Sequence, residues 1–180
     1  MTSKLIYGDQ VEELDKIFLK DKFYFPNNSS RKNVLKKNDK SYHGFALGIV
    51  FSWTHGHEWI LSAISKQPKY SVLLKKAMNF INTFDPEFEC TTIQFNKNYK
   101  ISKHIDSNNV GESYIIGLGN YVGGELIVYD ENNKATYIDI NHRFFKFNGS
   151  EYYHEVAEFF GDRITLVFFK LGGINGSLKK

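Results

Sequence analysis

Hydrophobic and polar positions change their spacing near residue 86 of the chain. Before it, apolar residues recur every three or four positions, the spacing that places side chains on one face of a helix. Helices are therefore expected over residues 9–20, 57–66 and 69–83. Asp85 and Pro86 end the last of these. Residues 26–42 are polar, basic and rich in turn formers, which predicts a long surface loop.

After Pro86, short runs of β-branched and aromatic residues follow one another, separated by Gly, Asn and Asp. Seven strands are expected: CTTIQFN (90–96), SYIIGL (113–118), GELIVYD (124–130), ATYIDI (135–140), RFFKF (143–147), HEVAEF (154–159) and RITLVFF (163–169). Their spacing is close to the roughly 8 to 12 residues of antiparallel sandwiches and barrels. The pattern predicts one α+β domain over residues 1–180, in which a helical N-terminal support (1–86) buttresses a β core (87–172).

Composition narrows the class of protein. With 42% hydrophobic and 24% charged residues the chain reads as a globular protein. Cys90 is the one cysteine, so no intramolecular disulfide can form, and no secretory pattern opens the sequence. We expect an intracellular protein, cytoplasmic or nuclear. Its longest apolar runs fall short of the roughly 20 residues of a membrane helix, so no membrane span is expected. A net charge of +3 is only weak support for a polyanionic partner.

The stretch KHIDSNN, residues 103–109, carries the candidate chemistry. On a strand, His104 and Asp106 project to the same side. Two imidazoles and one carboxylate on one face of an ion are the ligand set of non-haem Fe(II) oxygenases, so a second histidine must come from another strand. His154 opens the strand HEVAEF and suits this role. Arg163 and Thr165 share one face of the last strand, where a cation beside a hydroxyl can bind a carboxylate.

Other histidines compete for a metal-binding interpretation. The stretch HGHE, with His55, His57 and Glu58, imitates a ligand pair, but no suitably spaced glutamate and third histidine follow it. It is interpreted as a loop or a helix start. His43 and His142 are expected to be surface or structural residues. Just before the second ligand, Asn148 and Gly149 predict a tight turn that delivers His154.

Taken together, these motifs resemble a known family. Residues 90–170 are similar to the double-stranded β-helix, or jelly roll, of Fe(II)- and 2-oxoglutarate-dependent dioxygenases, with the H-x-D…H triad at His104, Asp106 and His154. The resemblance implies Fe(II), 2-oxoglutarate and O2, with Arg163 and Thr165 on the distal carboxylate of 2-oxoglutarate. Tyr99 matches a tyrosine that helps to hold the same co-substrate. The stretch YVGGELIVYD resembles the G-G-E-L turn common in these enzymes.

Within that superfamily the chain most resembles the TET and J-binding-protein group, which oxidises pyrimidine methyl groups in nucleic acid. HIDSNN is similar to its H-x-D-x-x-N, which implies that Asn109 contacts a flipped base. RITLVFF resembles its R-V-S-L-V-F-Y, which places Phe169 against the base without the tyrosine hydroxyl. Tyr153, beside His154, is a further candidate for the substrate pocket.

The substrate implied by this likeness is the methyl of thymine or 5-methylcytosine. Two alternatives stay open: a prolyl-type protein hydroxylase with the same metal centre and a protein or peptide substrate, and a binding module that has lost catalysis. The sequence leaves the oligomeric state open.

Overall fold

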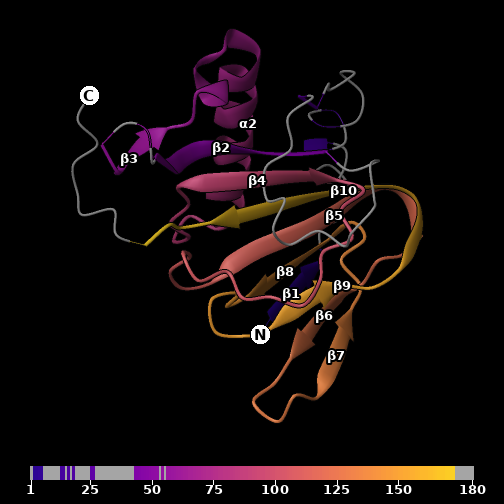
Figure 1. Ribbon diagram of the computed structural model, residues 1–180. Helices are drawn as coiled ribbons and strands as arrows, with labels where there is room; N and C mark the ends of the chain where they lie inside the picture. Colours follow the sequence, from indigo (N-terminus) through magenta and orange to yellow (C-terminus); the bar gives the residue numbers. More distant parts are fainter. Residues whose placement is uncertain are drawn as a thin grey trace.

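A computed structural model describes residues 2–5, 13, 14, 16, 18, 25, 26, 43–52, 54 and 56–172, the first four by their backbone alone. Two antiparallel sheets dominate them (Figure 1). The major sheet has the strand order β1 (Thr2–Leu5), β8 (Arg143–Phe147), β5 (Ser113–Gly123), β10 (Phe159–Phe169), β4 (Thr92–Lys97), β2 (His43–Ser52) and β3 (Glu58–Leu61). The minor sheet has the order β7 (Ala135–Ile138), β6 (Leu126–Tyr129) and β9 (His154–Val156).

Helix α2 (Pro68–Phe84) confirms the predicted helix over 69–83. Pro68 suits the first turn because it has no backbone N–H to satisfy there. The buried side chains of α2 lie three or four positions apart, at Tyr70, Leu73, Ala77, Phe80, Ile81 and Phe84. Asp85, which precedes Pro86, turns to an extended conformation with φ −142° and ends the helix.

Side chains of the major sheet alternate between two hydrophobic clusters, one on each face. Leu166 and Phe168 of β10 pack toward α2, whereas Val167 between them packs toward the minor sheet. Ile116 and Ile115 of β5 divide in the same way. The sheet therefore separates a helix-side core from a second core under β6 to β9, and Figure 1 shows α2 and the minor sheet on opposite sides of it. The coarse prediction of an antiparallel β core braced by a helix is confirmed.

The predicted helical N-terminal support is wrong in part, because this half of the chain also contains strands. Residues 57–66, predicted as a helix, instead form strand β3 and a single 3-10 turn, η3 (Ile64–Lys66). Strand pairing with β2 overrides the local apolar spacing, with Ile60 opposite Val50. The strands β1 and β2 also precede residue 86, and β2 runs between β4 and β3 inside the major sheet. Both halves of the chain thus build one sheet.

All seven strands predicted after Pro86 are confirmed within a few residues at each end. Most of the helix predicted over 9–20, and the loop predicted over 26–42 beyond Pro26, lie outside the described residues. Leu14 and Phe18 are described and buried in the helix-side core. Among the helices described here, none combines the length and apolarity needed to cross a membrane.

Candidate active site

Two segments 50 residues apart meet beside the minor sheet and bring two histidines together. His154 is the first residue of β9, and His104 lies between β4 and β5. Each backbone N–H donates to the carbonyl of the other histidine, at 3.0 Å from His104 and 2.9 Å from His154. This is the hydrogen-bonded pair of an antiparallel bridge. Both side chains therefore leave on the same side, with ring centroids 4.3 Å apart.

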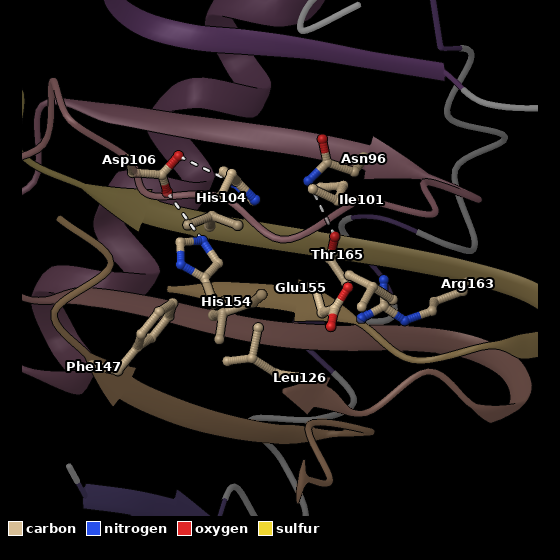
Figure 2. Close-up of a pocket in the computed structure, with 13 residues that line it drawn as sticks. Asn96, Ile101, His104, Asp106, Leu126, Phe147, His154, Glu155, Arg163 and Thr165 are labelled. Carbon is tan, nitrogen blue, oxygen red and sulfur yellow. Dashed lines mark hydrogen bonds and ion pairs between the residues drawn. The ribbon is translucent and has the colours of Figure 1, made fainter. Parts of the chain in front are cut away.

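Asp106 completes the cluster. Its backbone N–H donates to the Gly149 carbonyl at 2.9 Å, which ties it to the predicted turn before β9. The turn is confirmed, although neither Asn148 nor Gly149 adopts a positive φ. Asp106 Oδ1 is 3.6 Å from His104 Nε2, and Oδ2 is 3.6 Å from His154 Nε2. One ligand atom from each residue lies within 4.8 Å of the other two, so the three side chains converge (Figure 2).

Backbone carbonyls fix the tautomer of both histidines. His104 Nδ1 is 2.8 Å from the Ser102 carbonyl oxygen, and His154 Nδ1 is 3.0 Å from that of Tyr152. A carbonyl oxygen can only accept, so each Nδ1 carries the hydrogen and donates. In the neutral rings, each Nε2 then presents a lone pair toward Asp106, which is the arrangement of metal-binding histidines.

The three residues fit a divalent cation. His104 Nε2 is buried and has no hydrogen-bond partner in the part of the chain that the structure describes. An unsatisfied buried acceptor is costly, on the order of 1–3 kcal/mol, and a bound cation would satisfy it. Two imidazoles with one carboxylate form the facial ligand set of non-haem Fe(II) sites.

A buried arginine lies at the far end of the same cavity (Figure 2). Arg163 is 2% exposed, and its Nε and Nη2 donate to the Gly124 carbonyl at 3.2 and 2.9 Å. Rings of Tyr121 and Phe159 flank the guanidinium, with centroids 5.6 and 5.5 Å from Cζ. Burial lowers the pKa of Arg163 to about 10, so the group stays charged at neutral pH.

No acidic side chain among the described residues forms an ion pair with Arg163. A buried charge that lacks a counter-ion is strongly unfavourable. An anionic ligand in the cavity would supply the missing charge.

Gly124 lets the backbone approach this arginine. Its φ is +73°, and a Cβ built on it would lie 2.8 Å from Arg163 Nε and 2.9 Å from Cδ. Only glycine combines the left-handed conformation with that clearance. The predicted G-G-E-L turn therefore serves as a cradle for Arg163.

Between the cluster of His104, Asp106 and His154 and the Arg163 guanidinium, the cavity leaves a volume of about 30 Å³ for the centres of water-sized molecules. Its apolar wall consists of Ile101, Ile115, Leu126, Phe147, Val156 and Val167. Polar groups from Asn96 and Thr165 project between the two charged ends (Figure 2).

Of the predicted substrate residues, Asn109 lies next to Asp106, and neither Asn109 nor Phe169 lines the cavity itself. Asn109 Nδ2 donates to Asp106 Oδ2 at 3.5 Å. The Asn109 backbone also bridges to Leu171, two residues after Phe169. Phe169 packs against the minor-sheet core and is half-buried. The structure thus brings the Asn109 segment and the end of β10 together.

Tyr99 and Tyr153 do not line the cavity. Tyr99 is 1% exposed, and its hydroxyl lies against Gly44 of β2. A Cβ built on Gly44 would lie 2.6 Å from that hydroxyl. Tyr153 is 52% exposed on the outer face of the minor sheet, where Lys103 Nζ lies 5.5 Å from its ring centroid. Strand alternation turns Tyr153 outward because His154 points inward.

The competing histidines stay apart from the cluster. His57 occupies a left-handed turn with φ 57°, and Glu58 begins β3. His55 lies outside the described residues. His142 Nδ1 is 2.8 Å from Asn141 Oδ1, a local and partly buried contact, and His43 begins β2. Within the described ranges, His104, Asp106 and His154 are the group whose ligand atoms could hold a metal ion.

Sequence reasoning missed Asn96, which lines the cavity and is 2% exposed. A signal was present, because TTIQFN alternates polar residues at 92, 94 and 96 with Ile93 and Phe95. When a central strand of a sheet has polar residues along one face, that face contacts either solvent or an internal polar site. Tyr121, beside Arg163, was also missed, and no local motif distinguishes it.

Comparison with solved structures identifies the class to which the fold belongs. A 2OG-Fe(II) oxygenase family oxidoreductase from Burkholderia pseudomallei aligns with a TM-score of 0.61 and 18% identity, over 88% of this chain and 77% of that one. A prolyl hydroxylase from Trichoplax adhaerens, in complex with a hypoxia inducible factor peptide fragment, aligns with a TM-score of 0.62 and 14% identity, over 94% and 81%. NgTET1 in complex with 5mC DNA aligns with a TM-score of 0.52 and 17% identity, over 72% and 61%.

These likenesses show that the chain has the fold of 2OG-Fe(II) oxygenases. Neighbours of both kinds, one solved with DNA and one with a peptide, share it. No family model and no curated protein sequence matches the chain.

Proposed function

We propose that the chain is an Fe(II)- and 2-oxoglutarate-dependent dioxygenase that hydroxylates a C–H bond. The observation that carries the proposal is a single cavity with the His104, Asp106 and His154 cluster at one end and the buried Arg163 cation at the other. One end suits a divalent metal and the other a carboxylate. The two sheets then correspond to the double-stranded β-helix of the oxygenase superfamily.

Each group in the cavity has a role in this proposal. His104 Nε2, His154 Nε2 and an Asp106 oxygen would hold Fe(II), which when bound would activate O2 at the expense of 2-oxoglutarate. Arg163 neutralises the distal carboxylate of 2-oxoglutarate, and Thr165 adds a hydroxyl beside it. The apolar wall, which includes Ile115, keeps water away from the reacting groups and strengthens these electrostatic contacts.

Asp106→Ala tests the metal site. We expect it to abolish both Mn(II) binding in calorimetry and iron-dependent release of succinate from 2-oxoglutarate. Asp139→Ala is the matched control, because Asp139 is 58% exposed and lies outside the cavity, and it should retain both properties. A folded Asp106→Ala protein that still released succinate with iron would refute the assignment.

For the substrate we propose the methyl of thymine or 5-methylcytosine in nucleic acid. Asn109 supports this, because its amide lies next to Asp106 and can read the edge of a base brought to the metal. Recognition of a flipped base requires hydrogen bonds to its edge and an aromatic or apolar surface. Phe169 follows Thr165 and Val167 on the same face of β10, and in this proposal it provides that surface at the end of the strand.

A prolyl-type protein hydroxylase is the alternative. The structural likeness to the prolyl hydroxylase is the more extensive one, with a TM-score of 0.62 over 94% of the chain against 0.52 over 72% for NgTET1. Both alternatives use the same metal centre and differ only in what approaches it.

Mass spectrometry decides between them. The iron-loaded protein is incubated with thymine- or 5-methylcytosine-containing oligonucleotides and, separately, with a proline-rich peptide. Our proposal predicts a mass increase of one oxygen on the oligonucleotide, and Asn109→Ala or Phe169→Ala should reduce that product while sparing uncoupled succinate release. Hydroxylation of the peptide alone would overturn the nucleic-acid proposal and leave the reaction class intact.

A further inference from the structure

A buried row of polar side chains crosses from β4 to β10 between the two ends of the cavity. Asn96 and Thr165 are directly opposite each other in the antiparallel pairing. They are 2% and 3% exposed, and both line the cavity. A mid-sheet position inside an apolar core is costly for polar groups unless their hydrogen bonds are made.

Hydrogen bonds fix the orientation of the Asn96 amide. Gln94 Nε2 donates to Asn96 Oδ1 at 3.1 Å and to the Phe95 carbonyl at 3.0 Å. The Asn96 oxygen is thereby held toward Gln94, and its Nδ2 donates to Thr165 Oγ1 at 3.2 Å (Figure 2). A flipped amide would set two NH2 groups against each other, so the network selects one orientation.

The fixed Asn96 amide limits the directions in which the Thr165 hydroxyl can donate its hydrogen. Because its oxygen accepts from Asn96, its hydrogen must point elsewhere, and no side-chain hydrogen bond other than that from Asn96 is found for it among the described residues. Arg163, two positions earlier on the same strand, turns its buried cation toward the same space. A hydroxyl donor and a cation then face one anionic ligand group.

We propose that Asn96 is a positioning residue for 2-oxoglutarate, holding the Thr165 hydroxyl as a hydrogen-bond donor to the carboxylate that Arg163 neutralises. This inference rests on the proposed function. Asn96 acts through Thr165 and does not itself take part in the oxidation. The alternative is that Asn96 only links β4 to β10 and contributes to stability alone.

Calorimetric titration of the anaerobic Fe(II) protein with 2-oxoglutarate tests the inference without turnover. Thr165→Val and Asn96→Ala should each weaken binding about tenfold or more, the value of a hydrogen bond to a charged group. Thr165→Ser keeps the hydroxyl and should bind as the unchanged protein does. The double variant should bind no more weakly than Thr165→Val alone, because in this proposal Asn96 acts only through the Thr165 hydroxyl.

A second ligand separates positioning from general damage. The acid 2-oxopentanoate retains the keto acid group but has a methyl in place of the distal carboxylate, so its affinity should be the same in all these proteins. Should Asn96→Ala fail to fold, Asn96→Leu, of similar size, replaces it in the same titrations. Unchanged 2-oxoglutarate affinity in a folded Asn96 variant, or additive losses in the double variant, would overturn the inference.

Failure of the proposed function is distinguishable from failure of the inference. In the first case the unchanged Fe(II) protein binds no 2-oxoglutarate. In the second it binds 2-oxoglutarate, and Asn96 makes no difference to the affinity.

Discussion

Substitution of Gly124 by alanine tests whether the turn before β6 is a cradle for Arg163. The left-handed conformation, φ +73°, costs a non-glycine residue about 1–2 kcal/mol. The new methyl would also lie 2.8 Å from Nε and 2.9 Å from Cδ of a side chain that is 2% exposed and cannot move into solvent. Crowding of this kind costs about 1–3 kcal/mol. The expected loss of unfolding free energy is therefore about 2–5 kcal/mol.

Gly111 provides a matched control. Its φ is +71°, nearly that of Gly124, but a Cβ built there meets nothing within 4 Å. Gly111→Ala should cost only the conformational part, about 1–2 kcal/mol. Urea unfolding of both variants isolates the contact with Arg163. A titration with 2-oxoglutarate shows whether displacing the guanidinium weakens the binding proposed above. A Gly124→Ala protein that loses no more stability than Gly111→Ala, and that binds 2-oxoglutarate with unchanged affinity, would contradict this role of the turn.

Two further predictions concern contacts outside the cavity. The Tyr114 hydroxyl donates to Asp85 Oδ2 at 2.7 Å and is the main cause that holds the pKa of Asp85 below its ordinary value. The stabilisation is present above the unfolded carboxyl pKa, about 3.9, and is lost as pH falls through the folded pKa. Tyr114→Phe should thus cost about 1–2 kcal/mol near neutrality and progressively less in acid, and a pH-independent difference in urea unfolding would contradict this. Lys103 Nζ lies 3.5 Å from the centroid of the Tyr129 ring, so Lys103→Met should cost about 0.5–1 kcal/mol in unfolding experiments; an equal cost in a Tyr129→Leu background would show that the ring is not the partner.

Local pattern was sufficient for most of the β core. The strands after Pro86 combine β-branched and aromatic residues with turn formers at each boundary, and tertiary pairing agrees with that preference. The helix predicted over residues 57–66 was wrong because their apolar spacing fits a helix, whereas the free edge of β2 offers a strand-pairing partner. Such a choice depends on a neighbour distant in the sequence.

In the candidate site, too, some residues could be predicted from local sequence, whereas others depend on strand pairing with distant parts of the chain. His104, Asp106, His154 and Arg163 could be predicted because their residue types and order are specific together. Tyr153 was proposed from its nearness in sequence to a ligand, and strand alternation turns it outward. Tyr99 was proposed from the family resemblance, and it packs behind the cavity wall, in one buried cluster with Ile101 and Val156. Asn96 belongs to the cavity through its register opposite Thr165, which only the pairing of β4 with β10 determines.

The two faces of strand β10 have different roles. Arg163, Thr165 and Val167 face the cavity, while Leu166 and Phe168 fill the core beneath α2. Because the faces alternate with a period of two, deleting any one residue within this stretch would exchange them for all positions beyond the deletion. Substitutions can therefore tune ligand recognition or packing separately, whereas a change of length in β10 would damage both at once.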